Sequence, residues 1–121
     1  MITGSCHCGA VSFEYDAEPS HLTSCNCSLC RRLGGLMAYA PLDQVRVHHA
    51  PDAVIDYIQG DRTLAFVTCR TCGCTTHYTP TDPAVTRMKV NLAMADPQAI
   101  AGFRIRHFDG ANTWRYLDEA D

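Results

Sequence analysis

The spacing of the cysteines constrains this chain more than any other feature. Eight cysteines stand among 121 residues, and they fall into three short clusters within residues 6–8, 25–30 and 69–74. Pairs separated by one or two residues brace a fold poorly as disulfides, whereas neighbouring thiolates chelate a metal ion well. We therefore interpret the clusters as zinc ligands. A framework of four disulfides is the alternative, and it would require an oxidising compartment.

The bulk properties argue for a cytoplasmic chain without a membrane or nucleic-acid partner. Residues 1–6 lack the charged region and the apolar region of a signal peptide. No apolar run approaches the roughly 20 residues that cross a bilayer. The net charge is −3, and the Lys and Arg residues are spread along the chain without a basic tail, so electrostatics do not favour nucleic acid. In a reducing cytoplasm, closely spaced cysteines more often bind metal than form disulfides.

The length and the apolar pattern predict one mainly β domain over residues 1–121. An apolar content of 46% excludes a disordered chain. Residues 10–15 alternate apolar and polar side chains, which is typical of a strand. Further strands are expected over residues 36–40, 45–48, 54–59, 64–68, 75–78, 85–92 and 103–108, with residues 113–117 closing the chain. Helix is expected only as single turns, over residues 28–33, where Ser28 could act as the cap, and over residues 95–100.

Two of the cysteine pairs suit one closed structural site. The pair Cys69-x-x-Cys72 is half of a zinc site, and the glycine that follows relieves its tight turn. The partner that we predict is Cys6-x-Cys8, which also precedes a glycine. Four thiolates close a zinc shell, and this tie would join segments about sixty residues apart. A structural zinc contributes on the order of 10 kcal/mol or more of apparent binding energy in small zinc peptides, so we expect it to stabilise this fold. Two separate reduced pairs are the alternative.

The cluster of Cys25, Cys27 and Cys30 has a different character. Three thiolates leave one position of a tetrahedral zinc open, as in sites that bind a substrate. Arg31 and Arg32 follow directly, and they would moderate the negative charge and attract the carboxylates of an anionic thiol; as solvated surface charges they would do neither. The alternative is a structural site completed by a fourth residue, for which the sequence offers His7, Cys74 and His77.

Other conspicuous residues favour structural interpretations. Cys74, the odd cysteine, is expected to be a buried free thiol that packs as a small hydrophobe. Trp114 is expected in the core with its aromatic neighbours. The pair Asp109-Gly110 is expected to form a turn rather than a catalytic acid.

Three motifs in this order resemble one family: Gly4-Ser-Cys-His-Cys-Gly-Ala-Val11, Cys25-Asn-Cys-Ser-Leu-Cys-Arg-Arg32 and Cys69-Arg-Thr-Cys-Gly73. It is the glutathione-dependent formaldehyde-activating enzyme (GFA) family, also called the centromere-protein-V/GFA domain. The resemblance implies a mostly antiparallel "β-tent" fold with two zinc ions per chain. It assigns the structural zinc to Cys6, Cys8, Cys69 and Cys72. It assigns the catalytic zinc to Cys25, Cys27 and Cys30.

The resemblance also implies a reaction, that of an S-(hydroxymethyl)glutathione synthase, which is classed as a carbon–sulfur lyase. We therefore expect a zinc-dependent enzyme that adds a glutathione-like thiol to formaldehyde or a related small aldehyde. Two departures are visible: Asn26 stands where many members carry His, and the chain is short for the glutathione-active type. A non-catalytic zinc module that binds a protein partner and a thiol redox sensor are the alternative functions.

Overall fold

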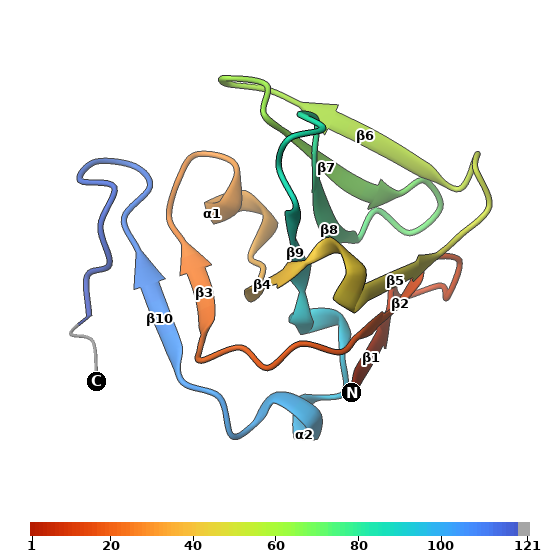
Figure 1. Cartoon of the computed structure of the whole chain (residues 1–121), viewed down its shortest axis with the longest axis horizontal. Helices are drawn as coiled ribbons and strands as arrows, with labels where there is room; N and C mark the ends of the chain where they lie inside the picture. The colour runs from red at the N-terminus through yellow and green to blue at the C-terminus, as the bar shows by residue number, and fades with distance from the viewer. Residues whose placement is uncertain (119–121) are drawn as a thin grey trace.

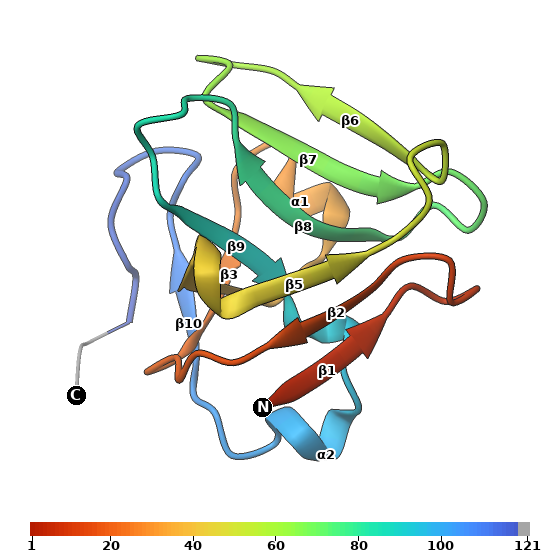
Figure 2. The ribbon, with the colours of Figure 1, turned by 45° about the vertical axis from the view of Figure 1, so that its right-hand side comes forward.

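The computed structural model describes residues 1–118, which form two β-sheets with very little helix. The smaller sheet has the order β1-β2-β5 and is antiparallel, with strands β1 (Ile2–Ser5), β2 (Ser12–Tyr15) and β5 (Val45–His48). Figures 1 and 2 show this sheet beside the N-terminus and against the larger sheet. The prediction of a mainly β fold is confirmed.

The larger sheet has seven strands in the order β10-β3-β4-β9-β8-β7-β6. Its strands are β3 (Leu22–Cys25), β4 (Met37–Pro41), β6 (Val54–Ile58), β7 (Leu64–Cys69), β8 (Thr75–Pro80), β9 (Arg87–Asn91) and β10 (Ile105–Phe108). All neighbours are antiparallel except β10 and β3, which run parallel at one edge. The predicted antiparallel arrangement therefore holds for all of the sheet but this pair.

The helices are single turns. They are α1 (Cys30–Leu33), α2 (Pro97–Ile100) and the 3₁₀ turns η1 (Leu42–Gln44) and η2 (Leu92–Met94). Helix α1 begins at Cys30 after Leu29, so the expectation that Ser28 caps it is wrong. A helix this short is not stable alone; it is held because Leu29 and Leu33 pack on Phe66 and Tyr78 of the larger sheet. No helix among the described residues is long and apolar enough to span a bilayer.

The main core lies between the two sheets, where the alternating strands place their apolar side chains. Phe13 and Tyr15 of β2 are fully buried, as the alternation over residues 10–15 predicted. The Tyr15 hydroxyl donates to the Tyr39 carbonyl at 2.7 Å, which satisfies a polar atom inside this core. Trp114 departs from its prediction: it is 71% exposed, so the expectation that it lies in the core is wrong.

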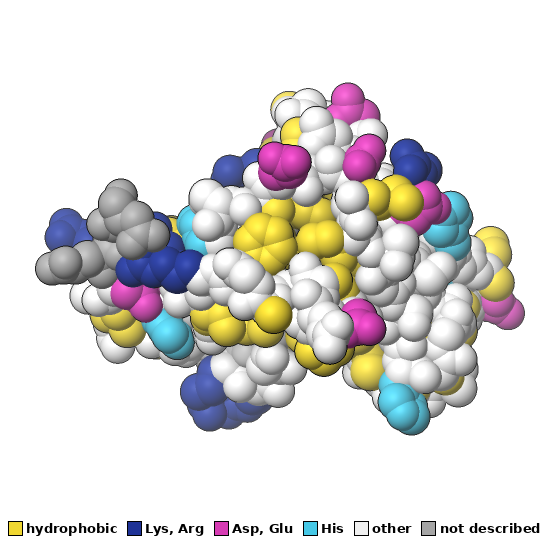
Figure 3. All heavy atoms as spheres, turned by 90° about the horizontal axis from the view of Figure 1, so that it is seen from below, with side chains coloured by type: hydrophobic (Ala, Val, Ile, Leu, Met, Phe, Trp, Pro, Cys, Tyr) yellow, Lys and Arg dark blue, Asp and Glu magenta, His cyan; other side chains and the backbone are white. Residues whose placement is uncertain are grey.

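One face of the molecule carries its charges in scattered groups. On the face shown in Figure 3, Lys and Arg side chains stand in separate small groups among acidic residues, and hydrophobic side chains gather near the middle. A protein that binds nucleic acid usually presents a continuous basic strip. The face in Figure 3 shows no continuous basic strip.

Candidate metal centres

The first group of sulfurs comes from Cys6, Cys8, Cys69 and Cys72, and the structure brings all four within 4.8 Å of one another. The Sγ atoms of Cys6 and Cys8 are 3.7 Å apart, and those of Cys8 and Cys69 are 3.6 Å apart. A tetrahedral zinc with Zn–S bonds of about 2.3 Å places its sulfurs about 3.8 Å apart. The separations therefore fit a zinc shell, and they exceed the roughly 2 Å of a disulfide bond.

Backbone groups hold these sulfurs in place. The Val11 N–H donates to Cys6 Sγ at 3.3 Å. Backbone N–H groups, that of Cys74 first, lower the pKa of Cys72 to about 5, which favours the thiolate form that binds metal. Gly73 follows with φ +79°, a conformation that a side chain would strain, so the glycine permits the turn as predicted.

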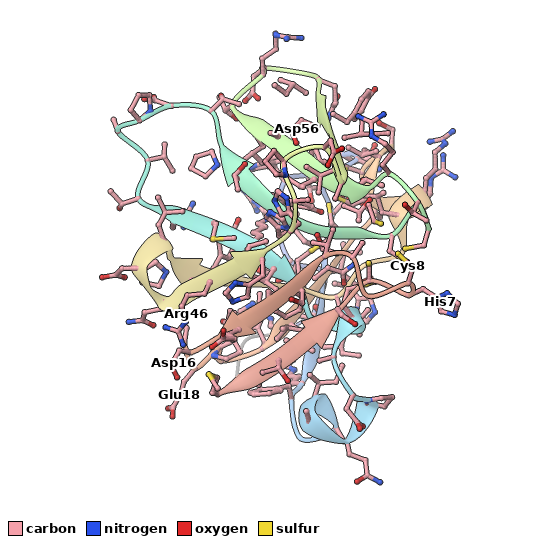
Figure 4. All side chains as sticks on the ribbon, turned by 90° about the vertical axis from the view of Figure 1, so that its right-hand side faces the viewer. His7, Cys8, Asp16, Glu18, Arg46 and Asp56 are labelled. Carbon is pink, nitrogen blue, oxygen red and sulfur yellow. The ribbon has the colours of Figure 1, made fainter. Side chains whose placement is uncertain are left out.

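This group lies where the two sheets meet. Cys6 directly follows β1 of the smaller sheet, and Cys69 is the last residue of β7 of the larger sheet. Figure 4 shows Cys8 turned toward neighbouring sulfurs, whereas His7 points away from the protein. Cys74 is half-buried and packs against the same group. A metal bound here would tie the N-terminal strands to the larger sheet.

The second group consists of Cys25, Cys27 and Cys30, whose sulfurs also lie within 4.8 Å of one another. Cys25 ends β3, Cys30 begins α1, and all three are half-buried. The Cys27 N–H donates to Cys25 Sγ at 3.4 Å, and the Cys30 N–H donates to Cys27 Sγ at 3.3 Å. The loop thus wraps its own donors around the sulfurs, as loops that bind metal through thiolates do.

No fourth ligand joins this trio within residues 1–118. His7 points away from the protein, and Cys74 packs with the first group. His77 precedes Tyr78 on β8, so its side chain faces the opposite side of the sheet from Cys30. The three residues that the sequence offered as a fourth ligand therefore lie elsewhere.

Tyr78 contacts the trio from the sheet below it. Its hydroxyl lies 3.3 Å from Cys30 Sγ, and the residue is only 1% exposed. Burial raises the pKa of Tyr78, so the hydroxyl keeps its proton and can donate to a thiolate. Burial also raises the pKa of Cys30 to about 12, and the hydrogen bond from Tyr78 acts in the opposite direction. This contact could not be predicted from the sequence, because the two residues are 48 positions apart.

Asn26 is joined to a distant turn by a set of hydrogen bonds. Its Nδ2 donates to Asp109 Oδ1 at 3.0 Å, and its Oδ1 accepts from the Ala111 N–H at 3.0 Å. Asp109 is 5% exposed and also accepts from the backbone and the hydroxyl of Thr113. The hydrogen bond from Asn26 is the main cause that lowers the pKa of Asp109. The turn predicted at Asp109-Gly110 therefore also anchors the loop that carries the trio.

The same turn covers one side of the trio. A Cβ atom on Gly110 would lie 2.8 Å from Cys25 Sγ and 3.0 Å from Cys27 Cβ, so only glycine fits this approach. A hollow of about 270 Å³ opens beside Cys25 and Asn26, with Phe108 in its wall. Of the three cysteines, Cys25 lines this hollow.

Comparison with known proteins agrees with this geometry. The family model described as "Glutathione-dependent formaldehyde-activating enzyme" matches residues 1–108. The chain belongs to this family, which is abbreviated GFA.

Individual relatives add detail on the extent of the likeness. A curated protein of Halomonas elongata, named "Putative glutathione-dependent formaldehyde-activating enzyme", is 44% identical over 41 residues. That match spans 33% of this chain and 26% of the relative's length. The crystal structure of a Rhodobacter sphaeroides protein is 33% identical, with a TM-score of 0.68, over 86% of this chain and 99% of that one. The fold is therefore shared across nearly the whole of the solved relative.

Proposed function

We propose that this protein is a zinc-dependent carbon–sulfur lyase of the S-(hydroxymethyl)glutathione synthase type. It would join a glutathione-like thiol to formaldehyde or a related small aldehyde, and it would work in the reducing cytoplasm. The observation that carries the proposal is the three-cysteine group, which has no fourth protein ligand within residues 1–118 and lies beside a hollow. The family to which the chain belongs supports the same reaction.

The two sulfur groups would have different tasks. Cys6, Cys8, Cys69 and Cys72 would hold a structural zinc, because their separations fit a closed tetrahedral shell. Cys25, Cys27 and Cys30 would hold the catalytic zinc. When bound there, zinc offers its fourth position to a substrate thiol and lowers the pKa of that thiol.

The protein's own residues would keep this second site in shape. The Tyr78 hydroxyl would donate to a Cys30 thiolate 3.3 Å away, which would orient that ligand and moderate its charge. Asn26 and Asp109 hold the ligand loop against the turn that covers it. Gly110 brings that turn close without occupying the space beside Cys25.

The reaction balances without an added oxidant or reductant. The thiol sulfur forms a bond to the carbonyl carbon, and the π-electron pair of the C=O bond moves to the oxygen. The oxygen then takes up the proton that the thiol released, which gives a hemithioacetal. The reverse steps release the aldehyde and the thiol.

Exchange between formaldehyde and glutathione, followed by NMR, tests the proposal. The zinc-loaded protein should accelerate exchange above the spontaneous rate, and Cys27→Ser should abolish the acceleration. An unchanged exchange rate with both metal sites loaded would contradict the proposal.

A further inference from the structure

A row of side chains crosses the larger sheet beside the three-cysteine group. Lys89 of β9 is the register partner of Tyr39 on β4 and of Tyr78 on β8. Paired residues on neighbouring strands place their side chains on the same face of the sheet. Lys89 therefore stands between two tyrosines, and the second of these is the one whose hydroxyl contacts Cys30.

Lys89 is the only lysine of the chain, against nine arginines. Its Nζ lies 4.5 Å from the centre of the Tyr39 ring and 5.6 Å from that of the Tyr78 ring. Arg87 adds a second cation, with its guanidinium carbon 4.5 Å from the Tyr39 ring centre. Aromatic faces hold cations in position without neutralising their charge.

These two cations have no acidic partner among the residues that the structure describes. Among residues 1–118, the ion pairs involve Arg46, His48 and His107, and no carboxylate lies within ion-pair distance of Arg87 or Lys89. Lys89 is also half-buried, so its interaction with an anion is screened less than that of a fully exposed side chain. A pair of held, unneutralised cations is suited to bind a carboxylate.

A hollow of about 230 Å³ lies at this position, and Tyr39, Arg87 and Lys89 line it. Leu64 lines it as well, and Leu64 also packs in the cluster that contains Tyr78 and Cys30. Leu64 therefore contacts both the hollow that Arg87 and Lys89 line and the cluster that contains Cys30.

We propose that Arg87 and Lys89 bind a carboxylate of the substrate whose thiol reacts beside Cys30. The subsite would take a carboxylate of the thiol that the proposed function already names, and it would lie on the face of the sheet that carries Tyr78. This inference rests on the proposed function. It replaces the expectation for Arg31 and Arg32, which are exposed on α1; the Arg32 guanidinium already donates to the Ser28 carbonyl at 2.6 Å.

Protection of the single lysine in the zinc-loaded protein tests the subsite with a readout that does not depend on the metal. The protein is treated with an amine-acetylating reagent, and acetylation of Lys89 is followed by mass spectrometry. Glutathione should slow acetylation severalfold, whereas glutathione diethyl ester should not. The ester carries the same thiol and amine and so consumes the reagent equally. Equal acetylation with both compounds would overturn the inference.

Binding to the cobalt-substituted protein gives an independent readout. Glutathione should perturb the cobalt absorption at about tenfold lower concentration than the diethyl ester, as expected for hydrogen bonds to a charged group. Lys89→Met should remove most of this preference, and Lys89→Arg should keep it. If Arg31→Met removed the preference and Lys89→Met did not, the subsite would be misplaced.

Turnover separates this inference from the proposed function. A preference for glutathione that depends on Lys89, without any acceleration of formaldehyde exchange, would contradict the proposed reaction and leave the subsite standing. Acceleration that is equal for glutathione and its diester would contradict the subsite and leave the reaction standing.

Discussion

The two cysteine groups both offer thiol sulfurs to a metal ion, but their surroundings differ. The four-sulfur group lies at the junction of the two sheets, and all of its ligands come from two tight turns. The three-sulfur group lies under a separate turn, beside a hollow, and it is supported by Tyr78 and Asp109 from distant parts of the chain. A metal held by four sulfurs would be closed, whereas a metal held by three would keep one position open, and the hollow lies beside the three-sulfur group.

Replacing a ligand in the junction group should have the largest effect. Cys69→Ser removes a buried sulfur that joins β7 to the N-terminal segment. Because metal binding and folding are coupled in such sites, the melting temperature should fall by about 10 °C or more. Thermal unfolding followed by circular dichroism measures this change. A melting temperature equal to that of the wild type would show that the group does not stabilise the fold.

The matched change in the trio should separate metal content from stability. Cys27→Ser replaces the same atom at a half-buried position whose loop remains anchored by Asn26. This variant should keep the wild-type circular dichroism spectrum, lose one of two zinc ions and lose activity. Metal analysis by mass spectrometry gives the count. Unfolding of the whole protein would mean that the trio is structural too.

Removing one hydroxyl group tests the contact between Tyr78 and the three-cysteine group. Tyr78→Phe keeps the ring packed on Phe66, with which it is in edge-to-face contact at 4.1 Å, and removes only the hydroxyl near Cys30. Loss of such an outer hydrogen bond typically weakens metal affinity by about tenfold or more. Competition with a chelator should show this loss at one of the two sites. Equal weakening at both sites would point to a general structural effect.

His77 should make the stability of the folded protein depend on pH independently of the cysteine groups. Burial lowers the pKa of His77 to about 4, against about 6.5 in an unfolded chain. As the pH falls below 6.5 the unfolded chain binds a proton that the folded protein does not. Stability should therefore fall by about 2 kcal/mol between pH 7 and pH 5.

The variant His77→Gln lacks this titration, so it isolates the effect. Urea unfolding of both proteins at pH 7 and pH 5 should show their stability difference shrinking by about 2 kcal/mol at the lower pH. Contributions from the cysteines cancel in this comparison. A difference that stays constant would show that His77 is not held neutral in the folded protein.

The local features were predictable from the sequence. The grouping of Cys6 and Cys8 with Cys69 and Cys72 followed from spacing. Each pair lies in one tight turn and supplies two of the four thiolates of a closed zinc site, so a second pair completes the site. The mainly β fold followed from short alternating segments. The assignment of these residues as zinc ligands stays a prediction.

The long-range features were not predictable. Tyr78 and Asp109 reach the trio from 48 and 83 residues away, and alternation along a strand does not show which strand it will face. The parallel pairing of β10 with β3 depends on the path of residues 92–104, which connect β9 to β10. Trp114 was misplaced because aromatic character alone does not distinguish a core residue from an exposed one.

Cobalt substitution with metal counting distinguishes a closed metal group from an open one. The protein should bind two cobalt ions, and added glutathione should change the absorption of one of them while the other keeps its four-sulfur spectrum. Two four-sulfur spectra that do not respond to any thiol would contradict an open three-cysteine site, because they would show that both groups are closed.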